Sequence, residues 1–232
     1  MSVTPYKTDY GIYPATPGFE VSIGDYGIWE GHSWCHLGNI YEDYKPIYFN
    51  EKTEDVDKTE ACDIGVKMSA AGNSNVATPS AEAKVDLEFC IAGGLHYKAH
   101  IVKIKRFASV QNEVFPFLEK YLKLGKWDSK FWLAVEVCYA DNLLSLQSKT
   151  KGASLGIVGN IEDELKLAQA SFDTHFKYDK TNISILHFAG KVQFAGAKFV
   201  SFTPTGIFRK KLTPNYVGEA LDFETASEQS VY

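Results

Sequence analysis

The stretch "AKVDLEFCI", residues 83–91, alternates between an apolar and a polar set of side chains. A period of two residues is typical of a β-strand with one buried face. The stretch "ACDIGVKM", residues 61–68, alternates in the same way, and the connecting segment "SAAGNSNVATPSAE" is small, polar and prone to turns. The two stretches therefore predict a long amphipathic β-hairpin.

Further strands are predicted on both sides of this hairpin. The pair Gly93-Gly94 ends it, and "HYKAHIVKIKRF", residues 96–107, predicts another strand with a basic finish. The apolar run "FWLAVEVCYA", residues 131–140, predicts a strand in the centre of a sheet. Residues 168–178 alternate over eleven positions and predict a strand of a second amphipathic hairpin, after a glycine-rich loop at residues 149–160.

One segment favours a helix. Between Ser109 and Gly125 the apolar residues recur at helical spacing, with Ser109 placed to cap the start and Gly125 to end the helix. Pro116 must then lie in the first turn, or the helix starts later than Ser109. Together these elements predict an α+β fold: a mixed, mainly antiparallel twisted sheet with long amphipathic hairpins and a few helices.

The chain divides into three parts by composition. Residues 1–20 contain three prolines and predict an extended arm, residues 21–214 form the main domain, and residues 215–232 form an acidic tail. The 232 residues are 45% apolar and 14% aromatic, enough to bury a core. No basic-then-apolar leader opens the chain, and its four scattered cysteines suggest reduced thiols, so we expect a cytoplasmic protein.

The charge distribution is more informative than the net charge of −5, which argues against a general nucleic-acid binder. Residues 51–60 carry five acids and are interpreted as an acidic spacer. Residues 98–130 hold eight lysines and arginines against three acids. Such a block is either a solvated face or a contact with an anionic surface. On the second interpretation the lipid-headgroup-binding residues are Lys103, Lys105, Arg106, Lys123, Lys126, Lys130, Arg209, Lys210 and Lys211.

The usual signatures of catalysis and metal binding are missing from the sequence, so we expect no enzyme and no cofactor. The nearest metal candidate is His32, Cys35 and His36, which offers too few ligands for a structural zinc site. Glu136 stands within an apolar strand, and a buried carboxylate there must be paired or neutral. It is otherwise an edge or solvent-facing residue.

Four segments together resemble a known family. They are "VSIGDYGIWEGHSW" at residues 21–34, "YKPIYFNEK" at 44–52, "FWLAVEVCYADNLLSLQSKTKG" at 131–152 and "QFAGAKFVSF" at 193–202. Their order, with the long hairpin between them, resembles the pore-forming domain of gasdermins, and most of all the short fungal regulator-of-cell-death proteins. Glu136 matches a glutamate in that family's central strand. Gasdermins usually open with a basic helix, whereas this arm is proline-rich.

The resemblance implies a protein that binds acidic phospholipids, oligomerises, and moves from the cytoplasm to the plasma membrane to cause cell death. A diverged allelic homologue is its implied trigger, and no inhibitory domain is expected after the pore-forming part. A membrane-spanning strand needs about 9–11 residues with every backbone group paired. The implied membrane-inserting residues are Ile64, Val66, Met68, Val85, Leu87, Phe89, Ala170, Phe172 and Phe176.

Lysine at Leu87 or Phe172 is expected to abolish pores while sparing the fold, because both residues are assigned to faces that meet lipid. If both faces instead pack in the core of the soluble form, the two variants should misfold. The alternative function is a β-rich module that binds a small ligand or a carbohydrate through Trp29, Trp34 and neighbouring aromatic residues.

Overall fold

The computed structural model describes residues 7–8, 10–15, 20–30, 33–44, 48–71, 84–158, 177–178, 182–205 and 211–216. Antiparallel strands dominate this part of the chain and few helices accompany them, which confirms the predicted α+β class. In chain order the elements are β1 (Tyr13–Pro14), β2 (Asp25–Glu30), β3 (Ser33–Asn39), α1 (Ile40–Asp43), β4 (Glu51–Ile64), β5 (Val66–Ala71), β6 (Lys84–Phe89), β7 (Leu95–Phe107), the π-helical turn η1 (Val110–Val114), α2 (Phe115–Lys123), β8 (Trp132–Ser148), β9 (Ser154–Val158), β10 (Lys177–Tyr178), β11 (Ile183–Thr205) and β12 (Lys211–Tyr216).

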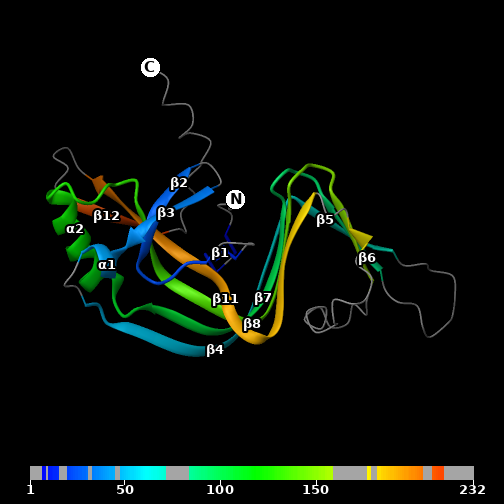
Figure 1. The fold of residues 1–232 in the computed structure, drawn as a ribbon, viewed down its shortest axis with the longest axis horizontal. Helices are drawn as coiled ribbons and strands as arrows, with labels where there is room; N and C mark the ends of the chain where they lie inside the picture. The colour runs from blue at the N-terminus through cyan, green and yellow to red at the C-terminus, as the bar shows by residue number, and fades with distance from the viewer. Residues whose placement is uncertain are drawn as a thin grey trace, which may run out of the picture.

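The main sheet is built around β8. This strand pairs with β7 on one side and β11 on the other, so the predicted central strand is confirmed and extends to Ser148. Strand β4 pairs with the outer side of β7. Residues 51–60 are therefore part of a strand, and their interpretation as a spacer was wrong. Figure 1 shows that the long strands β8 and β11 are sharply bent midway along their length.

A second, smaller sheet has the strand order β10-β9-β6-β5. The predicted hairpin is confirmed for β5 and β6, which pair from Val66 opposite Phe89 to Ala71 opposite Lys84. Gly65, with a φ of 61°, separates β5 from β4, so Ile64 pairs with β7 and is not part of this hairpin. The glycine-rich loop predicted at residues 149–160 is shorter, because Ser154–Val158 form β9 beside β6.

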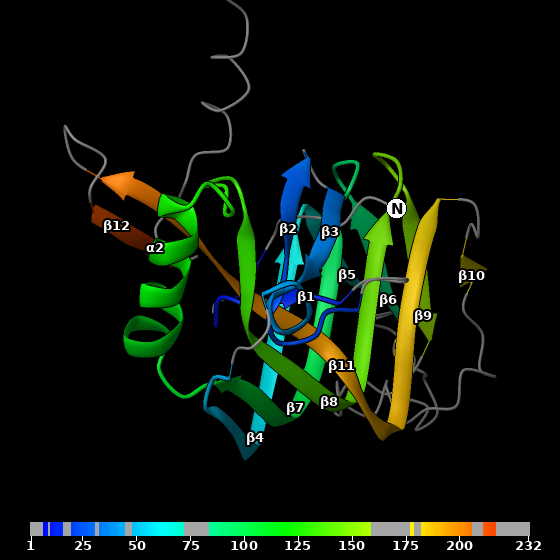
Figure 2. The same cartoon turned by 60° about the vertical axis from the view of Figure 1, so that its left-hand side comes forward.

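The predicted helix begins and ends where the sequence indicates. The Ser109 side chain accepts a hydrogen bond from the Asn112 backbone N–H at 3.2 Å, and Gly125 follows the helix with a φ of 68°. Pro116 lies in the first turn of α2, after η1. Figure 2 shows α2 at one end of the molecule and the smaller sheet at the other. In the described residues, neither helix is long and apolar enough to cross a membrane.

Where the structure describes the chain, its buried apolar residues form three clusters. One holds α2 against the start of β8 and the end of β11, and another lies between β6, β9 and the far ends of β8 and β11. The cluster between them covers the bent part of the main sheet and includes Ile12 and Ala15 of the N-terminal arm. A side chain at Gly196 would collide with Ile12, so this glycine lets the arm lie directly on β11. The described part of the arm is therefore integral to the core.

Candidate functional site

An exposed basic surface lies where α2 ends. Leu124 is 59% exposed, and four exposed lysines lie around it in the sequence; we call this group of five, Lys120, Lys123, Leu124, Lys126 and Lys130, the basic tip. Lys123 pairs with Glu119 at 2.7 Å, and no ion pair joins Lys126 or Lys130 to another described residue. Trp127 lies in the turn that follows α2, and its buried side chain anchors this turn to the core. An apolar side chain among cations, two of which have no ion pair in the described residues, suits an anionic interface.

The other basic residues of the block are placed differently. Lys105 and Arg106 lie on β7 and are paired with β4: Lys105 contacts Glu51 at 2.6 Å, and Arg106 contacts both carboxylate oxygens of Glu54 at 2.7 and 2.9 Å. Lys103 is half-buried on the same strand. Lys105 and Arg106 are therefore neutralised by β4, in contrast to Lys126 and Lys130 of the basic tip. Lys211 begins β12, and Arg209 and Lys210 lie outside the described residues.

The apolar face of the β5–β6 hairpin is largely buried. Leu87 and Phe89 are 1% and 0% exposed and pack against β8, β9 and β11, with Val66 beside them. Met68, directly opposite Leu87 in the register, is 59% exposed because β5 is an edge strand. The expectation that Leu87→Lys spares the fold is therefore wrong. Val85 belongs to β6, while Ala170, Phe172 and Phe176 lie outside the described residues.

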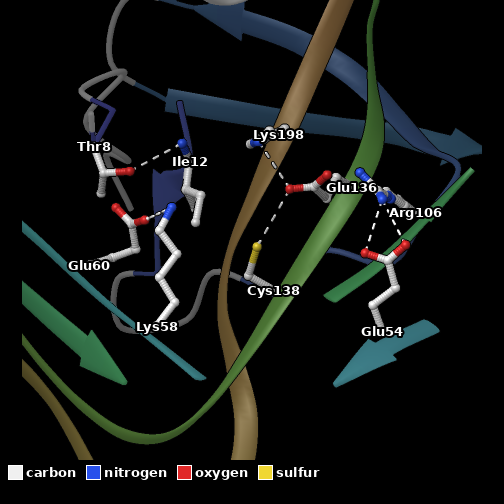
Figure 3. A network of polar contacts seen from close by, with 9 residues as sticks. All are labelled: Thr8, Ile12, Glu54, Lys58, Glu60, Arg106, Glu136, Cys138 and Lys198. Atoms are coloured by element: carbon white, nitrogen blue, oxygen red, sulfur yellow. Dashed lines mark hydrogen bonds and ion pairs between the residues drawn. The ribbon is translucent and has the colours of Figure 1, made fainter. Parts of the chain in front are cut away.

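Glu136 is paired within a polar network, and Figure 3 shows its contact with Lys198 and the nearby pair of Lys58 with Glu60. Its carboxylate is 8% exposed and contacts the Lys198 ammonium of β11 at 3.1 Å. Tyr10 of the arm hydrogen-bonds to the same carboxylate, and its ring lies 3.3 Å from the Nζ atoms of both Lys58 and Lys198. Lys58 also pairs with the buried Glu60. The network thus connects the arm to β4, β8 and β11.

The network keeps the Tyr10 phenol and the Cys138 thiol in their protonated forms. Burial, reinforced by the negative charge of Glu136, raises the pKa of Tyr10 to about 12. The same two causes raise the pKa of the Cys138 thiol well above its ordinary value. At neutral pH neither the phenol nor the thiol ionises, so neither group is an activated nucleophile. The arrangement favours a structural role for this network.

The aromatic residues of the opening stretch pack against each other and the core. The Trp29 ring stacks on Tyr13 with centroids 5.1 Å apart, and Trp34 lies 4.6 Å from Phe199. Gly27 is needed here, since a Cβ atom would lie 2.2 Å from the carbonyl oxygen of Cys35. Within the described ranges, the buried indole N–H groups of Trp29 and Trp34 have no hydrogen-bond partner.

Two of the three residues considered as metal ligands, Cys35 and His36, contact acidic side chains. His36 lies 3.5 Å from Asp25, Cys35 contacts Glu30, and His32 is outside the described residues. In the described ranges no cluster of three or more histidine, cysteine or acidic side chains is arranged to hold a metal ion.

Sequence reasoning identified Glu136 but missed its partners. Lys198 carried a usable signal, because it is a lone cation within the small and apolar strand "QFAGAKFVSF". Tyr10 carried none, since its contacts depend on how the arm folds back. Comparisons of the chain with protein-family models, with curated proteins and with solved structures found no match.

Proposed function

We propose that this chain is a gasdermin-like pore-forming protein. It binds acidic phospholipids through the basic tip, oligomerises, and inserts amphipathic hairpins into the membrane, which kills the cell. The observation that carries the proposal is the exposed Leu124 among four exposed lysines. Each basic residue near an anionic membrane contributes about 1 kcal/mol of attraction. The protein is cytoplasmic in this proposal until it moves to the plasma membrane.

The hairpin burial supports the second part of the proposal. Leu87 and Phe89 are covered in this structure, whereas the opposite face of β6 carries the exposed Glu88. A strand of this kind presents one face to lipid and the other to water once it is inserted. Burial between two sheets keeps the apolar face away from water until then.

Binding to vesicles is expected to require anionic lipid and to weaken as salt is added, because salt screens the attraction. Reversing two charges in Lys123→Glu/Lys126→Glu should weaken binding by at least about 2 kcal/mol, or 30-fold, because it removes two attractions and adds repulsion. Co-sedimentation with neutral and anionic vesicles measures this. The control is Lys149→Glu/Lys151→Glu, which makes the same charge change at two exposed positions of the β8–β9 loop. Equal binding to both vesicle types would contradict the proposed lipid contact.

A trigger is also expected, because a pore former that acts unaided would kill its host. The protein alone should be only weakly lytic, and a diverged homologue that binds the membrane-active state better should raise leakage strongly. Co-expression of both proteins in yeast, scored against each one alone, measures this. Full killing by the single chain would remove the partner from the proposal and leave pore formation in place.

A second candidate function is a module that binds a small ligand or a carbohydrate. The unpaired indole N–H groups of Trp29 and Trp34 favour it, because a ligand oxygen would satisfy a buried donor. Titration of tryptophan fluorescence with sugars tests this function. Absence of leakage from anionic vesicles under every condition would make it the better account.

A further inference from the structure

A row of β-bulges crosses the four long strands of the main sheet. On β4, two residues, Val56 and Asp57, lie opposite Val102 of β7. On β8, Asp141 has no partner on β7, because the adjacent residues His100 and Ile101 pair with Asn142 and Ala140. On the other side of β8, residues 190–192 of β11 lie opposite the same single residue, Asp141. A bulge bends its strand. The bend of β8 and β11 in Figure 1 therefore follows from this bulge row.

A histidine ties three of these strands together at the bulge row. The Nδ1 atom of His100 on β7 lies 2.8 Å from the Asp141 carboxylate, and its Nε2 atom lies 2.9 Å from the Asp57 carboxylate. Both aspartates are residues of the bulges themselves. We call these three residues the His100 clamp. The pairing holds only while the bulges of β4 and β8 stay at the level of β7.

Among the described residues, the charged groups that contact His100 come from these strands. Asp57 faces it from β4 and Asp141 from β8, while its direct cross-strand neighbours, Thr59 and Asn142, are uncharged. On its own strand, Lys98 is two residues away. Hydrogen bonds to Asp57 and then Asp141 raise the pKa of His100 above its ordinary value of 6.5. Only the protonated ring donates from both nitrogens, so protonation completes the clamp.

The opposite face of the bend is covered by the N-terminal arm. Ile12 packs there with Ala99 and Ile101 of β7, which alternate with His100. Tyr10 lies between the ammonium groups of Lys58 on β4 and Lys198 on β11. The arm therefore spans the sheet from β4 to β11 beside the bulge row, and Figure 1 shows β1 on the inner side of the bend.

We propose that the bulge row is a hinge of the main sheet, and that the His100 clamp on one face and the arm on the other latch it in the bent form. The purpose of this hinge rests on the proposed function. Release of the latch lets β8 and β11 straighten, and insertion requires this because strands that cross a bilayer must be paired without interruption. The hinge itself is a property of the protein in solution. It is therefore testable without any membrane.

The first experiment measures the distance across the bend. Nitroxide labels on unnatural residues at the exposed positions Lys67 and Lys126 report it in solution and leave the native cysteines intact. In His100→Ala the population with longer distances should rise about tenfold, which corresponds to about 1.4 kcal/mol. The control is His96→Ala. It removes the pair between His96 of β7 and Asp63 of β4, which lies away from the bulges. Unchanged distances in His100→Ala would overturn the hinge.

The second experiment uses pH. Because clamping raises the pKa of His100, the stabilisation is complete at low pH and is lost as the pH rises through the raised value. The extended population of the wild-type protein should therefore grow as the pH rises above about 6.5, and in His100→Ala it should not respond to pH in this range. The same response in wild type and variant would overturn the clamp.

A fold-safe variant separates the hinge from the pore. Asp57 is 95% exposed, so Asp57→Asn weakens the clamp without disturbing the core, and Asp63→Asn is its control. Leakage from anionic vesicles should be several-fold faster in Asp57→Asn than in the control. Longer distances in this variant without leakage from any vesicle would support the hinge and contradict pore formation. Leakage that is equal in both variants, with equal distances, would support pore formation and overturn the hinge.

Discussion

Leu87→Lys is expected to destabilise the protein by about 4 kcal/mol or more. Leu87 is 1% exposed in the cluster between β6, β9 and the far ends of β8 and β11. A lysine there removes apolar burial and forces an ammonium into a site without a described carboxylate partner among the cluster residues. A domain is stable by about 5–15 kcal/mol in total. The midpoint of urea unfolding should therefore fall sharply.

Met68→Lys is the matched variant. Met68 lies directly opposite Leu87 on the same face of the hairpin but is 59% exposed, so the folded protein should lose no more than about 0.5 kcal/mol. If this face meets lipid after insertion, the same lysine costs about 2–4 kcal/mol per copy at mid-bilayer, and leakage should collapse. Folded Met68→Lys with undiminished leakage would contradict the assignment of this face to lipid. A urea midpoint for Leu87→Lys equal to that of the wild type would contradict its burial.

Local patterns predicted the elements whose contacts are local. The alternation of residues 83–91 indicates β6, and Ser109 and Gly125 mark the limits of the helical segment. The strand formed by the acidic residues 51–60 was harder to predict, because charged side chains suggest a solvated segment when they are considered alone. These residues form β4 beside β7, where Lys105 pairs with Glu51 and Arg106 pairs with Glu54. That complementarity involves residues about fifty positions apart.

The candidate site was predictable to a similar extent. The excess of lysines indicated a basic surface, but not that Lys105 and Arg106 are neutralised while Lys126 and Lys130 stay exposed. A count of charges along the chain gives no information about strand pairing. The bulge row was equally hidden, because a bulge is a difference in register between two strands and is absent from the pattern of either one. The role proposed for His100 follows only from its contacts with Asp57 and Asp141, which lie on other strands.

Lys198→Ala is the second substitution with a large expected effect. It leaves the Glu136 carboxylate, 8% exposed, without the ammonium that lies 3.1 Å away. Breaking a buried ion pair from one side costs about 3–5 kcal/mol, because the remaining charge stays desolvated. The ring of Tyr10 also loses one of its two ammonium contacts, so the arm should become more accessible to proteases. Lys191→Ala, at an exposed lysine of the same strand, should change stability by less than about 0.5 kcal/mol.

The double variant Lys198→Ala/Glu136→Gln distinguishes an ion pair from simple packing. If the loss in Lys198→Ala comes from the stranded carboxylate, removing its charge should restore stability, and the two substitutions should couple by about 1.5 kcal/mol or more. If Lys198 acts only through its aliphatic stem, the two losses should add within about 0.5 kcal/mol. Urea unfolding of the four proteins measures the coupling. Additive losses would contradict the ion pair as the main contribution, and would leave the arm held by Ile12 on Gly196 and by the pairing of β1 with β11.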